Sequence, residues 1–285
     1  MESRLPSWLR KTISSSKNMH DIKSSLREKK LHTVCEEAKC PNIGECFEKG
    51  NATLMIMGNT CTRHCGFCTV SHGKPGPLDP DEPVKVAMQV RELGLKHTVI
   101  TSVTRDDLAD GGAVHFAKCI EEIRKTSPDT TIEVLVPDFE GRIDDIKTVC
   151  DAKPDVFNHN VETVARITRY IRNKASYARS MEVLSVAKRL LKGGLTKSGI
   201  MVGLGETFEE VEKTLCDLRK TGCDIVTIGQ YLKPRRDAIP VAEYIEPKVF
   251  RDYENIAKKL DFKAVFSDPL VRSSYLADEL MKRCK

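Results

Sequence analysis

Six of the eleven cysteines in this chain of 285 residues lie close together near its start. They form two groups of three, Cys35, Cys40 and Cys46, followed by Cys61, Cys65 and Cys68. A structural zinc site takes four ligands, and a cubane iron–sulfur cluster is normally held by four thiolates. Three closely spaced thiolates leave one metal position open, and an open position can bind a reactant. The sequence therefore predicts two metal clusters that each take part in chemistry.

The rest of the composition is that of a soluble globular protein without an export signal. The N-terminus has no apolar stretch of the kind a secretory signal needs, and no run of about 18 apolar residues could span a membrane. Clustered thiols in such a chain favour metal binding over disulfides. We expect a cytoplasmic protein, or one in an organelle matrix if a presequence has been removed.

Positive charge is concentrated in the first part of the chain. Residues 1–30 contain eight Lys and Arg against three Asp and Glu, a net charge of +5 that equals the net charge of the whole chain. Such a basic arm suits an acidic macromolecular partner, with Lys11, Lys17, Lys23 and Arg27 as the attracting charges. The alternative is a solvated extension that binds nothing.

Beyond about residue 50, strand-like segments alternate with segments of helical periodicity. The predicted strands are residues 52–57, 97–101, 131–136, 155–159, 197–202 and 224–230, with a further one at 262–266. The predicted helices are residues 84–95, 113–125, 180–191 and 207–221. This alternation indicates an α/β fold, a partial (β/α)6 barrel of parallel strands with N-terminal and C-terminal extensions. We expect the extension with the first cysteine group at residues 1–50, the barrel at 51–262 and the C-terminal extension at 263–285.

Polar segments follow the predicted strands, where barrel enzymes place their functional residues. They include the second cysteine group itself, TSVTRDD at 101–107, NHNVET at 158–163, GLGET at 203–207 and GQYLKP at 229–234. Any one of them could be an ordinary polar loop. Near the end, Arg272, Ser273, Ser274 and Tyr275 precede a short predicted helix, and the simplest role for a serine there is an N-cap.

These motifs resemble those of the radical S-adenosylmethionine superfamily, and of its lipoyl synthase family in particular. The superfamily resemblance comes from the C-x3-C-x2-C spacing of the second cysteine group directly after the first barrel strand. The narrower resemblance comes from the C-x4-C-x5-C spacing of the first group together with RSSY at 272–275. The further matching segments are LPSWLRK at 5–11, GNTCTRHCGFC at 58–68, TSVTRDDLADGG at 101–112, NHNVETV at 158–164, TKSGIMVGLGET at 196–207 and TIGQYLKP at 227–234.

The resemblance implies two [4Fe–4S] clusters. Cys61, Cys65 and Cys68 would hold the first, whose remaining iron binds S-adenosylmethionine. By their positions at strand ends, residues Thr101, Ser102, Asn160, Glu162, Met201 and Leu232 would contact that molecule. Cys35, Cys40 and Cys46 would hold an auxiliary cluster with a serine of RSSY as fourth ligand. We favour Ser274 over Ser273, a choice that the sequence alone leaves open.

The resemblance also implies a reaction and its partners. Two sulfur atoms would be inserted at C6 and C8 of a protein-bound octanoyl-lysine group to give the lipoyl cofactor, with the auxiliary cluster consumed as the sulfur source. Expected partners are octanoylated lipoyl carrier domains (2-oxoacid dehydrogenase E2 or glycine cleavage H protein), a ferredoxin- or flavodoxin-type reductant and an iron–sulfur carrier protein. We expect no nucleic acid and no membrane as partners.

Three other classes of protein fit these motifs less well. A biotin-synthase-like enzyme also pairs two clusters, but it lacks the leading C-x4-C-x5-C and the terminal RSSY. A ferredoxin-like electron carrier is usually shorter and completes its own cluster ligation. A zinc-ribbon nucleic-acid-binding protein needs paired C-x2-C motifs, and only Cys65 and Cys68 have that spacing among the clustered cysteines.

Overall fold

The structure is a computed structural model that describes residues 5–11 and 17–284. Its centre is an eight-stranded sheet in the order β1-β2-β5-β6-β7-β8-β9-β10. The strands are β1 (His32–Thr33), β2 (Thr53–Ile56), β5 (His97–Ser102), β6 (Thr131–Leu135), β7 (Val156–Asn158), β8 (Leu195–Val202), β9 (Ile225–Gln230) and β10 (Ala264–Ser267). All neighbours from β2 to β10 pair in parallel, whereas β1 pairs with β2 in antiparallel fashion. The predicted parallel α/β fold is confirmed.

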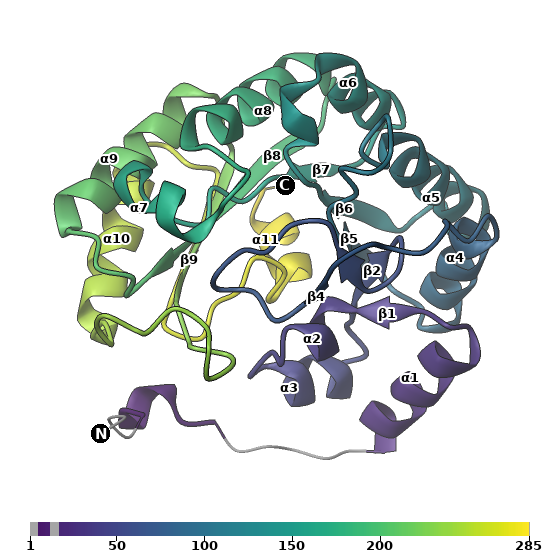
Figure 1. The fold of residues 1–285 in the computed structure, drawn as a ribbon, viewed down its shortest axis with the longest axis horizontal. Helices are drawn as coiled ribbons and strands as arrows, with labels where there is room; N and C mark the ends of the chain where they lie inside the picture. The colour runs from purple at the N-terminus through teal and green to yellow at the C-terminus, as the bar shows by residue number, and fades with distance from the viewer. Residues whose placement is uncertain (1–4, 12–16, 285) are drawn as a thin grey trace.

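Helices cover the outer face of the curved sheet and form an arc around it (Figure 1). They are α4 (Glu82–Glu92), α5 (Ala113–Thr126), α6 (Ile143–Asp151), α7 (Ala165–Ile171), α8 (Tyr177–Leu190), α9 (Phe208–Lys220) and α10 (Pro247–Lys259). Helix α9 begins with the capping box that Thr207 and Glu210 predict, since each side chain accepts the other residue's backbone N–H. The sheet and these helices make six strand–helix units, after which β10 completes the parallel strands.

Short elements precede and follow the barrel. At the N-terminal side lie η1 (Ser7–Leu9), α1 (Lys17–Glu28), α2 (Val34–Glu37) and α3 (Ile43–Glu48), and the loop after β2 contains β3 (Thr60–Cys61) and β4 (Ser71–His72). A 3-10 turn η2 (Phe139–Gly141) follows β6, and the last helix is α11 (Ala277–Arg283). Helix α11 begins after Leu276 with no side-chain cap, so the N-cap role considered for the two serines is wrong.

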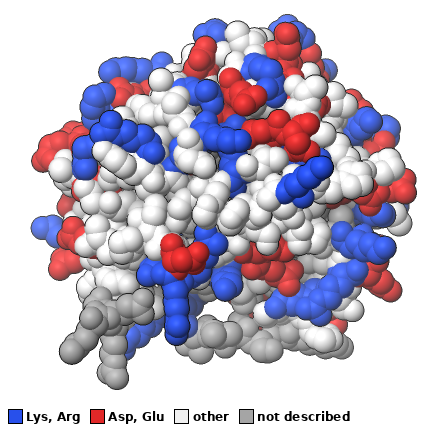
Figure 2. All heavy atoms as spheres, in the orientation of Figure 1, with Lys and Arg blue, Asp and Glu red and all other residues white. Residues whose placement is uncertain are grey.

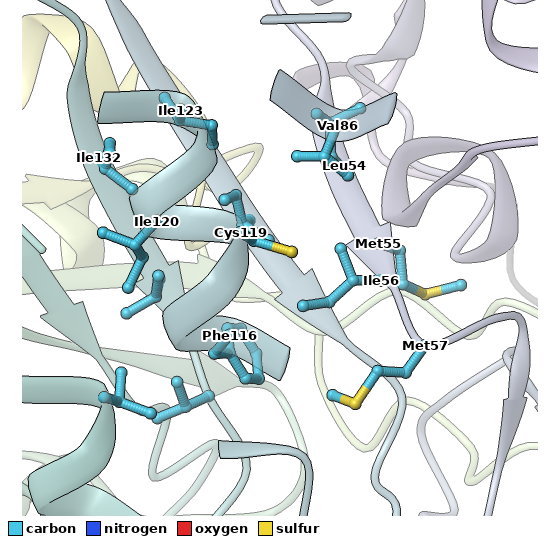
Figure 3. Close-up of a cluster of buried hydrophobic side chains, with 14 of the residues drawn as sticks. Leu54, Met55, Ile56, Met57, Val86, Phe116, Cys119, Ile120, Ile123 and Ile132 are labelled. Carbon is cyan, nitrogen blue, oxygen red and sulfur yellow. The ribbon is translucent and has the colours of Figure 1, made fainter. Parts of the chain in front are cut away.

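The two faces of the sheet differ in polarity because successive strand residues point to opposite sides. On the outer face, Leu54 and Ile56 of β2 lie toward Val86 and Cys119 of the covering helices, whereas Met55 points away from them (Figure 3). On the inner face, Glu133, Asn158 and Lys197 are polar yet fully buried. The inside of the barrel is therefore a packed, hydrogen-bonded interior.

The inner face contains a buried ion pair between β6 and β8. Lys197 Nζ lies 2.9 Å from both carboxylate oxygens of Glu133, and the two side chains are 0% and 1% exposed. Burial by itself would raise the pKa of Glu133, but Lys197 and His97 hold it well below its usual range. Glu133 is thus a carboxylate inside the barrel, and its contact with Lys197 links two strands that are not neighbours.

Removing one member of this pair should be strongly destabilising. The change Lys197→Met leaves an uncompensated buried carboxylate and should lower the free energy of unfolding by about 3–5 kcal/mol. The double change Glu133→Met with Lys197→Met removes both charges and should recover most of that loss. Urea unfolding of the cluster-free protein measures both. A single variant as stable as the unchanged protein would contradict the buried pair.

Candidate functional site

The second cysteine group lies on the long loop between β2 and α4, at the carboxyl edge of the sheet. Met57 and Gly58 leave β2 with positive φ angles of 67° and 85°, which turns the chain sharply into this loop. The Met57 backbone N–H is held at 2.7 Å by the buried carboxylate of Glu82. Cys61 Sγ accepts two backbone N–H groups, from Arg63 at 3.4 Å and from Thr104 at 3.3 Å. Two backbone amides thus point at the sulfur of Cys61.

A buried arginine fixes this loop to the ends of two neighbouring strands. Arg63, between Cys61 and Cys65, forms ion pairs with Asp106 at 2.7 Å and with Asp138 at 2.8 Å. Burial alone would raise the pKa of Asp138, but Arg63 lowers it to about 2. The loop is therefore held by the segments that follow β5 and β6. Sequence reasoning missed Arg63, although its place inside the cysteine motif was a signal.

The thiols of Cys65 and Cys68 lie in a poorly solvated place. Burial raises the pKa of Cys65 to about 12, partly opposed by the nearby positive charge of Arg172, and burial also raises the pKa of Cys68. A reactive free cysteine has a lowered pKa instead, whereas a coordinated thiol is deprotonated by its metal. The raised pKa values of Cys65 and Cys68 therefore argue against free, nucleophilic cysteines at these positions.

The residues predicted to contact S-adenosylmethionine differ in their hydrogen bonds and in their burial. The Thr101 hydroxyl already donates to the carbonyl of Leu135 at 3.0 Å, whereas the buried Ser102 hydroxyl has no partner among the described residues. Met201 and Leu232 are half-buried, in β8 and directly after β9. Of these four residues, Ser102 is thus the one whose hydroxyl is free to donate a hydrogen bond to a ligand.

Asn160 and Glu162 lie after β7, close to the second cysteine group. Glu162 has a φ of 68° and pairs with Ile200 of β8 as an isolated bridge. Burial raises the pKa of Glu162, and the positive charge of Arg172 opposes that rise as it does for Cys65. Glu162, Arg172 and Cys65 therefore lie near one another. Arg172 also donates to the carbonyl of Val161 and was not predicted from the sequence.

The first cysteine group and the RSSY segment share one pocket, although they are far apart in the sequence. Its lining includes Cys35, Cys40, Cys46, Arg272, Ser274 and Tyr275, together with His97 and Val99 of β5. Burial raises the pKa of Cys35 to about 11 and that of Cys46 to about 12, as in the second group.

The two serines of RSSY have different surroundings. Ser274 lines the pocket with the three cysteines. Ser273 instead lies toward the barrel interior, where its hydroxyl accepts from Asn158 Nδ2 and donates to Asn160 Oδ1, both at 2.9 Å. Only Ser274 of the two therefore faces the first cysteine group.

Contacts between the two ends of the chain hold this pocket together. Asn42 Nδ2 donates to the Leu270 carbonyl at 2.7 Å, and the Tyr275 hydroxyl lies 3.2 Å from both carboxylate oxygens of Glu45. Glu45 also pairs with Lys11 at 2.6 Å. The pocket is therefore lined by residues from both ends of the chain.

Among the described residues, no three His, Cys, Asp or Glu side chains converge closely enough for a single metal ion. A cubane cluster makes a different demand, since each thiolate binds its own iron atom and the sulfurs stay further apart. Two groups of three buried or half-buried thiols, with either amide donors or a serine nearby, fit a [4Fe–4S] cluster and do not fit a tetrahedral zinc ion.

A glycine in β9 allows the C-terminal segment to enter the barrel. A Cβ atom on Gly229 would lie 2.0 Å from the carbonyl oxygen of Val271. Gly229→Ala should therefore displace the segment that carries Ser274, lower stability by about 1–3 kcal/mol and expose the bond after Arg272 to trypsin. Thermal unfolding and limited proteolysis measure both effects.

Gly76→Ala is the matched control, because a Cβ there meets nothing within 4 Å. It should change stability by less than about 0.5 kcal/mol. Equal behaviour of the two alanine variants would show that the close approach at Gly229 does not hold the segment.

Comparisons with known proteins agree with the fold. The model of the radical SAM superfamily matches residues 55–218. Among solved structures, methylornithine synthase superposes with a TM-score of 0.55 over 92% of this chain and 81% of that one, at 13% identity. A maturase of the [FeFe]-hydrogenase gives a TM-score of 0.55 over 87% and 62%, at 14% identity. The chain is a radical S-adenosylmethionine enzyme.

The narrower family follows from the N-terminal part and from full-length relatives. The model for the N-terminal domain of lipoyl synthase matches residues 1–40. Lipoyl synthase of Caldicellulosiruptor saccharolyticus is 53% identical over 99% of both chains. That of Caldanaerobacter subterraneus subsp. tengcongensis is 56% identical over 98% of this chain and 97% of its own. The chain belongs to the lipoyl synthase family, whose cofactors are S-adenosylmethionine and [4Fe–4S] clusters.

Proposed function

We propose that this chain inserts two sulfur atoms, at C6 and C8, into an octanoyl group amide-linked to a lysine of a carrier protein, and so forms the lipoyl cofactor. The observation that carries the proposal is the shared pocket of Cys35, Cys40, Cys46 and Ser274. A radical S-adenosylmethionine enzyme needs one cluster to start its chemistry. A pocket that brings together three further cysteines and a serine indicates a second cluster with a different role.

Cys61, Cys65 and Cys68 would hold the cluster that binds S-adenosylmethionine. When bound, this cluster supplies the electron that cleaves S-adenosylmethionine to a 5′-deoxyadenosyl radical. The protein's part is to hold the loop still and to keep water away. Arg63 anchors the loop through Asp106 and Asp138.

S-adenosylmethionine would bind beside this loop, at the carboxyl ends of β5, β7, β8 and β9. The free hydroxyl of Ser102 suits a polar group of the ligand. Glu162 would accept from its amine or ribose, with Asn160 beside it. Met201 and Leu232 would pack against its adenine, and Thr101 would support the site through its bond to the Leu135 carbonyl.

Cys35, Cys40, Cys46 and Ser274 would hold the auxiliary cluster, which supplies the sulfur atoms. Serine oxygen is a harder ligand than thiolate, so it is the ligand that exchanges most readily at such a site. Ser274 is preferred to Ser273 because the Ser273 hydroxyl is already bonded on both sides, to Asn158 and Asn160.

The partners follow from this reaction. The octanoyl group would arrive on a lipoyl carrier domain of a 2-oxoacid dehydrogenase E2 or on a glycine cleavage H protein. A ferredoxin- or flavodoxin-type reductant would supply electrons, and an iron–sulfur carrier protein would restore the consumed cluster. We place the reaction in the cytoplasm. None of the described helices has the length and apolar character to cross a bilayer.

The basic arm is less free to attract an acidic carrier than its charge suggests. Lys11 is paired with Glu45, and the side chain of Lys17 lies outside the described residues. Lys23 and Arg27 of α1 remain as the candidate contacts. On the face drawn in Figure 2, Lys and Arg are interspersed with Asp and Glu, consistent with the zero net charge of residues 31–285.

The direct test of the proposed function is product formation. The reconstituted, reduced protein is incubated anaerobically with S-adenosylmethionine and an octanoylated carrier peptide. The mass of the peptide is then measured by mass spectrometry. We expect two sulfur atoms to replace two hydrogen atoms. A peptide that keeps its mass while 5′-deoxyadenosine accumulates would contradict the proposal.

Substitutions in the two cysteine groups should have different effects. Cys65→Ala should abolish cleavage of S-adenosylmethionine, because one ligand of the reducing cluster is lost. Cys40→Ala should leave cleavage but stop sulfur insertion, because only the auxiliary site is broken. Chromatographic assay of 5′-deoxyadenosine and mass spectrometry of the peptide distinguish the two. A normal yield of lipoyl product from the Cys40 variant would refute a sacrificial auxiliary cluster.

A further inference from the structure

Glu133 is the centre of a hydrogen-bonded network inside the barrel that the proposed chemistry does not use. Its Oε1 accepts from Asn158 Nδ2 at 2.7 Å and from Lys197 Nζ at 2.9 Å. Its Oε2 accepts from Lys197 at 2.9 Å and lies 3.7 Å from His97 Nε2. All four side chains are buried. Hydrogen bonds among buried side chains restrict how each of them can be placed, so this network fixes the position of the groups it contains.

This network extends to the RSSY segment through Asn158. A carboxylate can only accept hydrogen bonds, so the Asn158 amide must turn its NH2 toward Glu133. The second hydrogen of that NH2 is given to Ser273 Oγ at 2.9 Å. The side-chain oxygen of Asn158 is buried and has no partner among the described residues. The two hydrogen bonds that the Asn158 NH2 group donates, to Glu133 and to Ser273, therefore fix the orientation of the amide.

Ser273 is consequently held by two hydrogen bonds at the end of β7. Its hydroxyl accepts from Asn158 at the end of β7 and donates to Asn160 two residues further on. Ser274 is the next residue, and it faces the pocket of the first cysteine group. With Ser273 bound to the barrel wall, the backbone places Ser274 on the pocket side.

Glu133 also lies next to a residue that lines the same pocket, His97. His97 lies near Glu133 and lines the pocket, and its Nδ1 is 2.8 Å from Thr131 Oγ1 of the neighbouring strand. One buried carboxylate thus supports a wall of the pocket and, through Asn158, the serine segment opposite the cysteines. Through these contacts of Glu133, both parts of the pocket are connected to the same strand, β6.

We propose that Asn158, oriented by Glu133 and Lys197, is a positioning residue that holds Ser273 so that Ser274 stays at the pocket of Cys35, Cys40 and Cys46. The inference rests on the proposed function of that pocket and adds to it. A serine that must leave a metal site and return needs its backbone held nearby in the meantime. The Asn158 bond provides this restraint without touching the cysteines.

The test uses Asn158→Leu, which keeps the size of the side chain and removes both donors. We expect the backbone amides of residues 270–276 to exchange about tenfold faster in cluster-free protein. In the fully reconstituted protein, a chelator should remove iron from one cluster about fivefold faster, while the other cluster loses iron at the unchanged rate. Hydrogen exchange by mass spectrometry and timed iron release give the two readouts.

Ser267→Ala is the matched control, since its hydroxyl donates to the Phe250 carbonyl at 2.7 Å and lies in the same part of the chain. It should leave both readouts unchanged. If Asn158→Leu does not fold, Ser273→Ala breaks the same hydrogen bond and leaves the bond between Asn158 and Glu133 in place.

Either of two results would overturn the proposal, and each would contradict a different part of it. Hydrogen exchange in residues 270–276 that matches the control would show that Asn158 does not hold the segment. A loosened segment with unchanged iron release from both clusters would show that Ser274 is not a cluster ligand, which contradicts the proposed ligand set and not the hydrogen bond.

Discussion

The close packing of the C-terminal segment against β9 is the constraint on which this structure depends. The Asp268 backbone N–H donates to Ile228 at 3.1 Å, and the Gln230 N–H donates to Pro269 at 3.1 Å. Gly229 between them leaves room for the Val271 carbonyl. These contacts lead residues 270–276 from the end of β10 to the inner side of the sheet. The first cysteine group gains a serine there, and the two ends of the chain become parts of one pocket.

The two cysteine groups are supported in different ways, which suits the different tasks proposed for them. The second group lies on one loop, and a buried arginine ties that loop to two strand ends, so the site can stay unchanged through many turnovers. The first group has its cysteines on the N-terminal elements and its serine on the opposite end of the chain, which is held by hydrogen bonds to side chains. A site assembled from separate segments can release one ligand without loss of the others, as the removal of sulfur from a cluster requires.

The strands and four of the outer helices could be predicted because their local patterns agree with their burial. Residues 131–136 and 197–202 are apolar apart from a few positions, and they form β6 and β8. The first 50 residues lack a clear period, so α1 and the two-residue strand β1 were not predicted.

Among the site residues, Arg63, Arg172, Glu133 and Lys197 were missed because their partners are distant in sequence. A charged residue within each of two buried strands was the available signal for the last pair. The pocket shared by Ser274 and the first cysteine group was expected only through family resemblance, since no local pattern relates residues so far apart.

A crystal structure of the anaerobically reconstituted protein, with iron located by its anomalous scattering, tests the account most directly. The account predicts two separate four-iron clusters, one in the loop after β2 and one in the pocket between the two chain ends, with the Ser274 hydroxyl oxygen bound to an iron of the latter. A single cluster, or a second cluster whose nearest serine is out of bonding range, would contradict it.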